Sequence, residues 1–564
     1  MYYYSYENLK RITQTEAGKE IVNEFERVYN ENYANVPIPV INYSYVKLFY
    51  QNGDRKLHES IYFDRRKRLA LLQVLAIADD KWLDPLEEVL AAICDEFTWV
   101  LPAHNLTEDK TFEYVQIDLF SAETGFYLAE TAYILKDKLS ADIQKRIKIS
   151  LEEKIVKVCE KHVVRFDTTG NNWAAVCAGS VGLTYLYAFP ERFSLVKARV
   201  FAALERYLSG LGEDGYCFEG SGYWFYGFGF FSIFFDVYTQ LTGERHEMLN
   251  RSKVKNVLQY FKNARMDGKV FLPFADGGNA NLEANPWYFY TFKNLFEEDC
   301  ELPVLGKIVS MEKALGARIL NGVDRFATAQ TVPEKKKETV YYPSGQVFLH
   351  KNANYAFAAK GGHNGEFHNH NDVGAFQIVK NQKQLIADLG AGEYTKGYFV
   401  RNDGENERYG KKVFVCHSFS HSVPIVDGSF QKFNSREYRG EVVKQTDDCF
   451  TLDISKAYGL ELGTVVVSYE MQEKGVRVFY ACKGIQESVI FRFMSVIKPQ
   501  IKEGNTVIDE LTIKNDRAVM PTYEKAEYKN HSAETVYAYL IDYKVEGEES
   551  FEITFSFSLK KESR

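Results

Sequence analysis

Histidine is concentrated in one stretch of this chain. Six of the eleven histidines lie between His350 and His421, and His368 and His370 stand only two positions apart. On an extended chain, residues two apart point to the same side. That spacing suits two roles in one site, or two ligands on one metal. The alternative is a polar loop whose histidines only satisfy backbone groups, and the density of the cluster favours a functional site.

Two segments downstream of these histidines favour a metal site. Asp388 ends the apolar run Gln384-Leu-Ile-Ala-Asp388, and His421 begins His421-Ser-Val-Pro-Ile-Val-Asp427. Two histidines and one aspartate from neighbouring strands form a typical zinc ligand set. For Asp388 the alternative is a turn-capping role, which is common for aspartate after a strand.

The elements that position these residues are of two kinds. Up to about residue 320, apolar residues recur at helical spacing, and many such segments with short polar breaks suit a helical array or toroid. Asp84 is expected to be a helix N-cap with Pro85 as the first helical residue, and Ser140 to begin another helix. The expected buried faces are Leu86, Val89, Leu90 and Ile93 in the first, and Ile143, Ile147, Leu151, Ile155 and Val158 in the second.

Beyond the charged, proline-containing segment 331–338 the apolar period becomes two. Several short alternating strands separated by turns indicate an antiparallel β-sandwich. The sequence thus predicts an α+β multidomain protein, with a helical domain over residues 1–330 and a β-sandwich over 331–564. The clearest alternations are Val476, Val478 and Tyr480, and Phe551, Ile553, Phe555, Phe557 and Leu559.

Composition limits the class of function. A chain of 564 residues exceeds one ordinary core, so two or three domains are expected. The net charge of −8 argues against a chain-wide nucleic-acid surface, and it requires a local basic site for any polyanionic substrate. Aromatic residues make up 15% of the chain, which fits either large cores or faces that stack on sugar rings. Composition alone leaves both open.

The expected environment is a reducing one without a membrane. The eight cysteines form no CxxC pair, so a disulfide scaffold is not expected. No apolar run approaches the roughly 18 residues of a membrane span. The first residues, MYYYSYENLKR, lack the pattern of a signal peptide, so we expect a cytoplasmic protein, or a secreted or periplasmic one if the sequence is trimmed. The oligomeric state is left open.

Several motifs together resemble those of the heparinase II/III-like polysaccharide lyases. In the second half they are His368-Asn-His370-Asn-Asp372-Val-Gly-Ala-Phe, Asp388-Leu-Gly and the run that begins at His421. Their order and the α-then-β layout also match, so the resemblance covers nearly the whole chain. Two further motifs in the helical half are Gly170-Asn-Asn-Trp173-Ala-Ala-Val-Cys and Glu219-Gly-Ser-Gly-Tyr223-Trp-Phe-Tyr226-Gly.

The resemblance implies an incomplete (α/α) toroid followed by an antiparallel β-sandwich, with substrate between them. It also implies that His370, Asp388 and His421 hold one divalent metal ion, with zinc expected. The implied activity is β-elimination on uronic-acid glycans. Glycosaminoglycans such as hyaluronan, chondroitin or heparan sulfate are the expected substrates, and alginate is the alternative.

The resemblance also assigns catalytic roles. Tyr223 is the implied catalytic tyrosine, His368 a catalytic base, and Asn172 the ligand of the uronate carboxylate. Trp173 stands where several relatives have histidine, which leaves neutralisation of the carboxylate to Asn171 and Asn172. The chemistry needs such groups, because the C5 proton is weakly acidic and the leaving O4 must be protonated.

Other residues are weaker candidates for substrate contact. A tyrosine near a strand end is more often a packing residue, so the tyrosines here have that alternative. Arg401 and Arg408 are expected to supply local positive charge or to be ordinary surface residues. Phe274-Ala-Asp276-Gly-Gly-Asn resembles a family loop, but its aspartate has no role that we derive, and His417 is expected to be structural. The substrate-contact candidates besides Asn171 and Trp173 are Tyr226, His363, Asn364, Tyr394, Tyr398 and Arg401.

Two rival functions stay open. A glycoside hydrolase needs two carboxylates beside the scissile bond, and Glu213, Asp214 and Glu219 are available. That mechanism leaves the histidine cluster without a purpose. A metal-stabilised carbohydrate-binding protein without turnover would need the metal ligands but neither Tyr223 nor His368.

Overall fold

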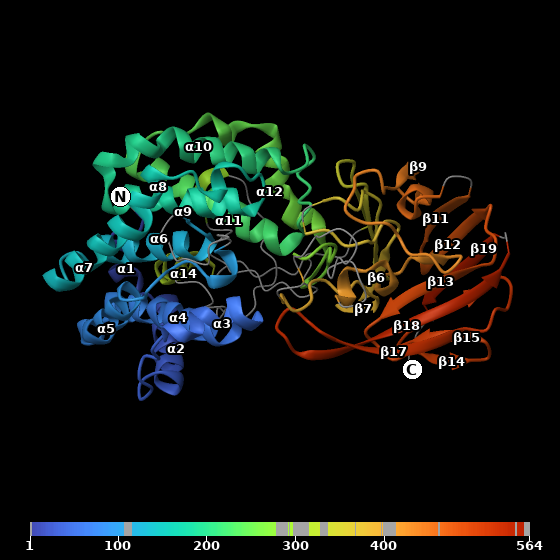
Figure 1. Ribbon diagram of the computed structural model, residues 1–564, viewed down its shortest axis with the longest axis horizontal. Helices are drawn as coiled ribbons and strands as arrows, with labels where there is room; N and C mark the ends of the chain where they lie inside the picture. The colour runs from blue at the N-terminus through green and yellow to red at the C-terminus, as the bar shows by residue number, and fades with distance from the viewer. Residues whose placement is uncertain are drawn as a thin grey trace. The chain divides into compact units, whose positions relative to one another are not determined.

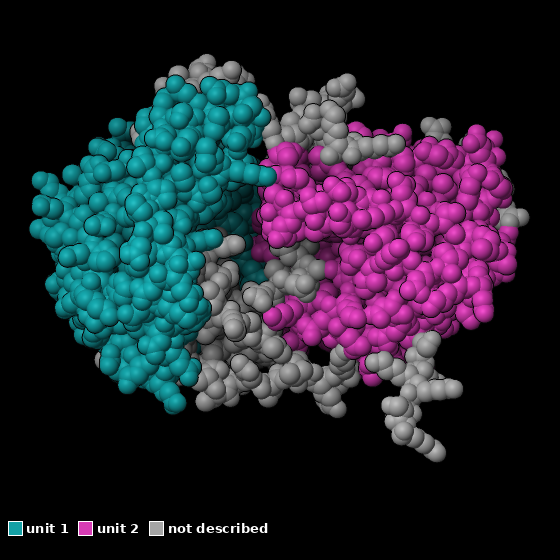
Figure 2. Space-filling model, turned by 90° about the horizontal axis from the view of Figure 1, so that it is seen from below, with its two compact units in different colours: residues 1–210, 225–254, 283–332 teal, residues 211–224, 255–282, 333–564 magenta. Residues whose placement is uncertain are grey.

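The computed structural model describes residues 3–105, 116–277, 291–292, 294–296, 315–326, 337–366, 368–395, 398, 413–460, 463–547 and 550–557. The chain forms two compact units (Figure 2), of which the first comprises residues 1–210, 225–254 and 283–332. The second comprises residues 211–224, 255–282 and 333–564. Each unit therefore contains segments that are distant in sequence. A domain boundary at residues 330/331 stays a prediction.

Unit 1 is helical (Figure 1). Two further helices, α11 (Ser221–Thr242) and α12 (Ser252–Ala264), each contribute residues to both units. The helices of unit 1 are α1 (Tyr6–Ile12), α2 (Glu16–Asn32), α3 (Tyr43–Asn52), α4 (Lys56–Ala78), α5 (Leu83–Cys94), α6 (Leu119–Ile134), α7 (Ala141–Leu151), α8 (Lys157–Lys161), α9 (Asn172–Ala188), α10 (Phe193–Ser209) and α14 (Gly316–Phe326).

The predicted helix at Ser140 is confirmed. The Ser140 side chain caps α7 by accepting the Ile143 N–H, and a π-helical turn, Glu152–Val156, joins α7 to α8. The predicted start of α5 was wrong, because the helix begins at Leu83, directly after a 3-10 turn, with Trp82 as its N-cap. Proline is tolerated at the third position, where its missing N–H has no intrahelical partner. Of the predicted faces, Leu86, Val89, Leu90, Ile93, Ile147, Leu151, Ile155 and Val158 are buried and Ile143 is half-buried.

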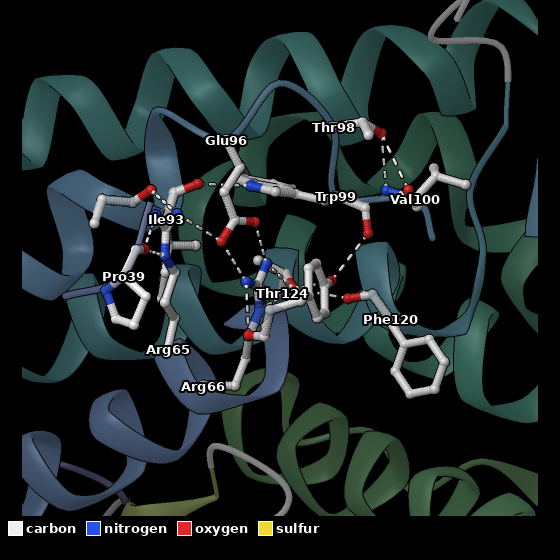
Figure 3. Close-up of polar contacts among 12 residues, drawn as sticks. Pro39, Arg65, Arg66, Ile93, Glu96, Thr98, Trp99, Val100, Phe120 and Thr124 are labelled. Carbon is white, nitrogen blue, oxygen red and sulfur yellow. Dashed lines mark hydrogen bonds and ion pairs between the residues drawn. The ribbon is translucent and has the colours of Figure 1, made fainter. Parts of the chain in front are cut away.

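The core of unit 1 includes a buried cluster of charges (Figure 3). Arg65 and Arg66 lie on α4, and both donate to the carboxylate of Glu96, which follows α5. Arg66 also lies over the ring of Tyr62 and donates to Thr124 of α6. Because the two arginines reach α6 and the segment after α5, they tie α4 to both.

Unit 2 consists mainly of antiparallel sheets. A two-stranded ribbon pairs β1 (Arg265–Asp267) with β2 (Val270–Phe271). A five-stranded sheet has the order β3 (Glu338–Tyr342), β4 (Val347–Lys351), β5 (Ala356–Lys360), β6 (Phe376–Lys380), β7 (Lys383–Ile386). A four-stranded sheet has the order β17 (Thr522–Lys529), β18 (Thr535–Glu546), β13 (Ser488–Ser495), β8 (Pro424–Val426). An eight-stranded sheet has the order β14 (Gln500–Lys502), β15 (Asn505–Ile508), β16 (Leu511–Asn515), β19 (Phe551–Phe557), β12 (Gly475–Lys483), β11 (Thr464–Gln472), β10 (Cys449–Asp453), β9 (Glu441–Thr446).

The core of unit 2 joins these three larger sheets. The Phe376 ring of the five-stranded sheet contacts Phe493 of the four-stranded sheet and Phe555 of the eight-stranded sheet. The predicted alternation is confirmed: Val476, Val478 and Tyr480 are buried on β12, and Val478 pairs with Ile553 of β19. Leu559 lies outside the described residues. Aromatic side chains thus serve the core here, and the predicted α+β fold class is confirmed.

Two absences hold for the described part of the chain. Seven cysteines are described, and all have free thiols. No described helix combines the length and the apolar character that a membrane crossing requires.

Candidate functional site in unit 2

Three segments of unit 2 meet around a fully buried aspartate, Asp276. The Gly277 N–H donates to the Glu219 carbonyl at 2.9 Å, and the Asp276 N–H donates to the His368 carbonyl at 3.2 Å. A Cβ at Gly277 would lie 2.4 Å from the Glu219 carbonyl oxygen and 2.7 Å from Tyr223 Cδ2. Glycine is therefore required there, and its close approach brings the start of α11 beside the histidine loop.

Tyr223, in the first turn of α11, lies between a tyrosine and a histidine. Its hydroxyl forms a 2.7 Å hydrogen bond with the Tyr394 hydroxyl, and its ring centroid is 4.4 Å from that of His368. Burial, together with the negative charge of Asp276, raises the pKa of Tyr394 well above its usual value of 10. Tyr394 therefore keeps its proton at neutral pH and lies next to the Tyr223 oxygen.

His368 is held by carboxylates on both sides of its ring. Nδ1 lies 2.9 Å from Asp276 Oδ2, and Nε2 lies 3.5 Å from Glu219 Oε2. The backbone of His368 has φ 54°, a left-handed conformation that is uncommon for residues other than glycine. Such conformations cluster at functional sites, where surrounding contacts hold them.

Asp276 also contacts the second histidine of the motif. Its Oδ1 lies 2.9 Å from His370 Nε2 and accepts a short hydrogen bond from the Tyr398 hydroxyl. The Cys416 thiol lies 3.3 Å from that hydroxyl. Sequence reasoning gave Asp276 no role; the glycine that follows it was the one local signal of a close approach.

The predicted metal ligands come together in unit 2. His370, Asp388 and His421 are buried, and their ligand atoms all lie within 4.8 Å of one another. Asp388 Oδ2 is 3.1 Å from His421 Nδ1. His370 Nδ1 and His421 Nε2 are buried and make no hydrogen bond with any described residue. Two imidazoles and a carboxylate grouped and buried in this way suit a divalent ion, so these residues fit the implied metal.

A second set of potential ligands shares one histidine with the first. Asp276, His370 and Cys416 also offer ligand atoms within 4.8 Å of one another. In this set the Asp276 carboxylate already has hydrogen bonds from Tyr398 and contacts with two imidazoles. The first set contains the two ring nitrogens without partners, so it is the better metal site.

Four predicted site residues belong to unit 1. The Asn171 side chain is the N-cap of α9 and accepts the Trp173 N–H at 3.2 Å, and Asn172 is buried as the first residue of that helix. The Trp173 ring lies under the Arg165 guanidinium, and the Tyr226 hydroxyl donates to Glu123. The predicted roles of these four residues toward substrate stay predictions.

The remaining candidates differ in their surroundings. His363 is partly exposed, and burial with the nearby Lys360 and Arg436 charges lowers its pKa to about 4. Asn364 is fully buried and donates to Gln431 and to a backbone carbonyl. Their roles toward substrate, and those of Tyr394 and Tyr398, also stay predictions. Arg401 and Arg408 lie outside the described residues.

The carboxylates of the hydrolase alternative are not equivalent. Asp214 accepts the backbone N–H of Tyr216 at 3.0 Å and that of Ser344 at 2.8 Å. Its two oxygens therefore connect two backbone segments, the one at Tyr216 and the one at Ser344. Glu219 instead faces His368, as described above. This arrangement does not favour a pair of carboxylates placed for hydrolysis.

Comparisons with known proteins identify the fold. No protein-family model and no curated protein sequence matches the chain. A structure of heparinase III matches with TM-score 0.61 at 11% identity, over 97% of this chain and 92% of that one. A mutant of heparan sulfate lyase HepC from Pedobacter heparinus matches with TM-score 0.59 at 11% identity, with the same coverage.

A chondroitin lyase shares the architecture as well. The Streptomyces coelicolor A3 chondroitin AC lyase, solved with chondroitin sulphate, matches with TM-score 0.51 at 10% identity, over 99% of this chain and 83% of that one. The predicted fold is thus confirmed: this chain has the helical toroid and antiparallel β-sandwich of the heparinase III and chondroitin AC lyase structures.

Proposed function

We propose that this protein is a polysaccharide lyase that cuts uronic-acid-containing glycans by β-elimination. The observation that carries the proposal is the contact between Tyr223 and His368 in unit 2, with Tyr394 bonded to the first and Asp276 to the second. The fold shared with heparinase III and chondroitin AC lyase supports the same class of reaction.

The reaction removes the proton on C5 of the uronate and breaks the bond from C4 to the leaving oxygen. Removal of that proton places a second negative charge beside the carboxylate, so donors on the carboxylate must stabilise the intermediate. Asn172, with Asn171 beside it, is the proposed donor. Its amide N–H groups do this without being ionised.

Tyr223 and His368 divide the proton transfers. When the C5 proton and the leaving O4 lie on the same face of the ring, Tyr223 reacts as the tyrosinate: it takes the C5 proton and then gives it to O4, which regenerates the tyrosinate. For the opposite epimer, His368 takes the proton and Tyr223 protonates O4. Tyr394, which keeps its proton, donates a hydrogen bond to the Tyr223 oxygen when that oxygen carries negative charge. Glucuronate is therefore the first expected substrate and iduronate the second.

The proposed chemistry defines the substrate class. A glycosaminoglycan supplies a uronate at alternate positions, and an acidic chain must meet it with local cations. His370, Asp388 and His421 are the residues that would hold the divalent ion, with zinc expected. When bound, that ion supplies a structural cross-link among the three segments that carry these ligands.

The test is digestion of a panel of hyaluronan, chondroitin, heparan sulfate and alginate. A lyase forms an unsaturated uronate end that absorbs in the ultraviolet, and the product masses show no added water. Saturated reducing ends alone would identify a hydrolase. If no polymer gives a product, the protein is the alternative described above, a carbohydrate-binding protein without turnover.

Replacement of one hydroxyl tests the assignment within that reaction. Tyr223→Phe should lower kcat by about 100- to 10,000-fold, because it removes the proton-transfer group. Metal content and the unfolding midpoint should stay at wild-type values. Tyr523→Phe, on an exposed tyrosine of β17, is the matched control and should leave kcat unchanged. An active Tyr223→Phe variant would exclude Tyr223 as the proton-transfer residue.

A further inference from the structure

We infer that Asp276 is a positioning residue whose single carboxylate fixes the tautomers of two histidines with different tasks. One oxygen orients His368 for proton abstraction, and the other orients His370 for metal binding. The first half of this inference rests on the proposed function. The second half rests only on the metal ligand set.

The geometry gives each histidine its own oxygen. Asp276 Oδ2 lies 2.9 Å from His368 Nδ1, and Asp276 Oδ1 lies 2.9 Å from His370 Nε2. The side chain of Asp276 is fully buried, and its backbone N–H donates to the His368 carbonyl. Asp276 is thus fixed through its backbone N–H and through both of its side-chain oxygens.

The direction of these hydrogen bonds determines where each imidazole keeps its lone pair. An ionised carboxylate only accepts hydrogen bonds, so the ring nitrogen that faces it must carry the hydrogen. Neutral His368 then keeps its lone pair on Nε2, the atom that can take a proton. Glu219 Oε2 is 3.5 Å from that nitrogen, outside the usual hydrogen-bond range, so it does not fix a hydrogen there as Asp276 does on Nδ1 at 2.9 Å. Neutral His370 keeps its lone pair on Nδ1, the buried nitrogen that has no hydrogen-bond partner among the described residues.

The assignment explains why the motif places two histidines two residues apart. They meet the same carboxylate through different ring nitrogens, Nδ1 in His368 and Nε2 in His370. The left-handed backbone at His368 accompanies this arrangement. Metal-binding histidines commonly donate their other ring N–H to a carboxylate, which sets the ring orientation and raises the basicity of the ligand.

Tyr398 completes the surroundings of Asp276. Its buried hydroxyl donates to the same Oδ1 that faces His370, and the Cys416 thiol contacts that hydroxyl. A carboxylate with this many donors is held as an acceptor, which is the state that the tautomer assignment requires. Asp276 therefore acts through the histidines: it contacts the metal ligand His370 and does not itself bind the ion.

The test compares Asp276→Ala and Asp276→Asn with wild type, using two independent readouts. In Asp276→Ala, kcat on the uronide polymer should fall about 100-fold or more with KM within about threefold, because His368 loses its fixed tautomer. Affinity for the divalent ion, measured by chelator competition, should fall about 10- to 100-fold. Asparagine offers only one acceptor, so Asp276→Asn should keep one of the two properties better than the other.

A Co²⁺-loaded protein separates positioning from direct ligation. The Asp276→Ala variant should bind Co²⁺ more weakly but show the wild-type absorption spectrum, because the ligands are unchanged. A changed spectrum would make Asp276 a metal ligand itself, with His370 and Cys416, and would overturn the inference. Wild-type kcat and wild-type metal affinity in Asp276→Ala would also overturn it.

A matched control and the wild type keep the two proposals distinguishable. Asp542→Asn removes another partly buried carboxylate of unit 2, one that pairs with Arg492, and should leave kcat and metal affinity unchanged. An equal loss in that variant would show a general effect of destabilisation and overturn the inference. If the wild type makes no unsaturated product, the proposed function fails, and the metal arm still decides the role of Asp276 toward His370. If the wild type holds no ion, the role of Asp276 toward His370 is overturned, and kcat decides its role toward His368.

Discussion

Two buried clusters of ionisable groups, one in each unit, differ in how completely their polar atoms are satisfied. In unit 1 the Glu96 carboxylate takes two hydrogen bonds from Arg66, at 2.5 and 2.7 Å, and one from Arg65, at 3.1 Å (Figure 3). Arg65 uses its other N–H groups on the carbonyls of Pro39 and Ala92. No buried side-chain nitrogen or oxygen of these three charged residues is left without a partner among the described residues.

The cluster in unit 2 is equally buried but is not complete. Asp276 is satisfied by its neighbours, whereas His370 Nδ1 and His421 Nε2 have no hydrogen-bond partner in the described chain. Burial of charge is therefore common to both clusters and does not mark a functional site. In unit 2 the unused atoms are imidazole nitrogens of residues grouped with a carboxylate, a set that suits a divalent ion, and an unsatisfied buried polar group is costly without a partner.

The largest effect on stability is expected in the cluster of unit 1, whose buried polar atoms all have partners. Glu96→Ala should lower the free energy of unfolding by about 3–5 kcal/mol, because it leaves two buried guanidinium groups without their carboxylate. Urea unfolding measures the loss, and metal content should stay at the wild-type value. Glu24→Ala, which removes a partner of the exposed Arg27, should leave the unfolding midpoint unchanged. A small loss in Glu96→Ala would mean that the cluster in unit 1 contributes little to stability.

The next largest effect is expected in the cluster of unit 2, on metal binding and stability. His421→Ala removes a ring nitrogen from the metal set, and bound metal should fall from about one ion per chain to a small fraction of that. At a metal concentration about 100 times the Kd, the wild type should lose about 3 kcal/mol of stability when a chelator is added. The chelator should leave the variant unchanged. Metal analysis and thermal unfolding, with and without chelator, measure both.

A neighbouring histidine provides the control for that experiment. His417 is four residues away, and its Nδ1 accepts the Phe419 N–H at 3.2 Å. His417→Ala should therefore keep the wild-type metal content. If it loses metal as His421→Ala does, or if chelation leaves the wild type unaffected, the predicted ligand set is wrong.

Local periodicity explains what was predictable in the fold. The alternation in β12 and β19 was readable because each strand has one buried face, and burial of every second residue leaves a period of two. The start of α5 could not be predicted in this way. A 3-10 turn directly precedes the helix, so the N-cap is Trp82. Caps depend on the backbone path before the helix, which periodicity does not encode.

Contacts across long sequence separations explain what was missed in the site. Asp276 lies 92 positions from His368, and Tyr223 lies 171 positions from Tyr394. No local pattern connects such pairs. The motifs that resemble a known family suggested His368, His370 and Tyr223. They gave no role to Asp276, because its hydrogen-bond partners could not be read from the sequence. The hydrogen bonds of Asp276 needed the folded chain.

The smallest expected effect concerns a third buried group, which belongs to neither cluster. Glu366 lies on the loop between His363 and His368, its Oε1 is 3.7 Å from His363 Nε2, and its side chain is 7% exposed. Burial raises the pKa of Glu366 to about 7, although the Lys360 charge opposes the rise. The folded protein thus holds a proton that the unfolded chain releases at lower pH.

The sign of the pH dependence follows from that difference. Because the folded pKa is raised, the contribution of Glu366 to stability is fully present below about pH 4.5 and is lost as pH rises through about 7. Glu366→Gln mimics the protonated acid, so its stability relative to wild type should increase between pH 5 and pH 8, by about 2–3 kcal/mol. Urea unfolding at both pH values measures the change, and Glu437→Gln, on an exposed glutamate, should show no such trend. A pH-independent difference for Glu366→Gln would mean that Glu366 ionises in place and that a nearby cation, Lys360 or Arg436, satisfies it, as the arginines satisfy Glu96.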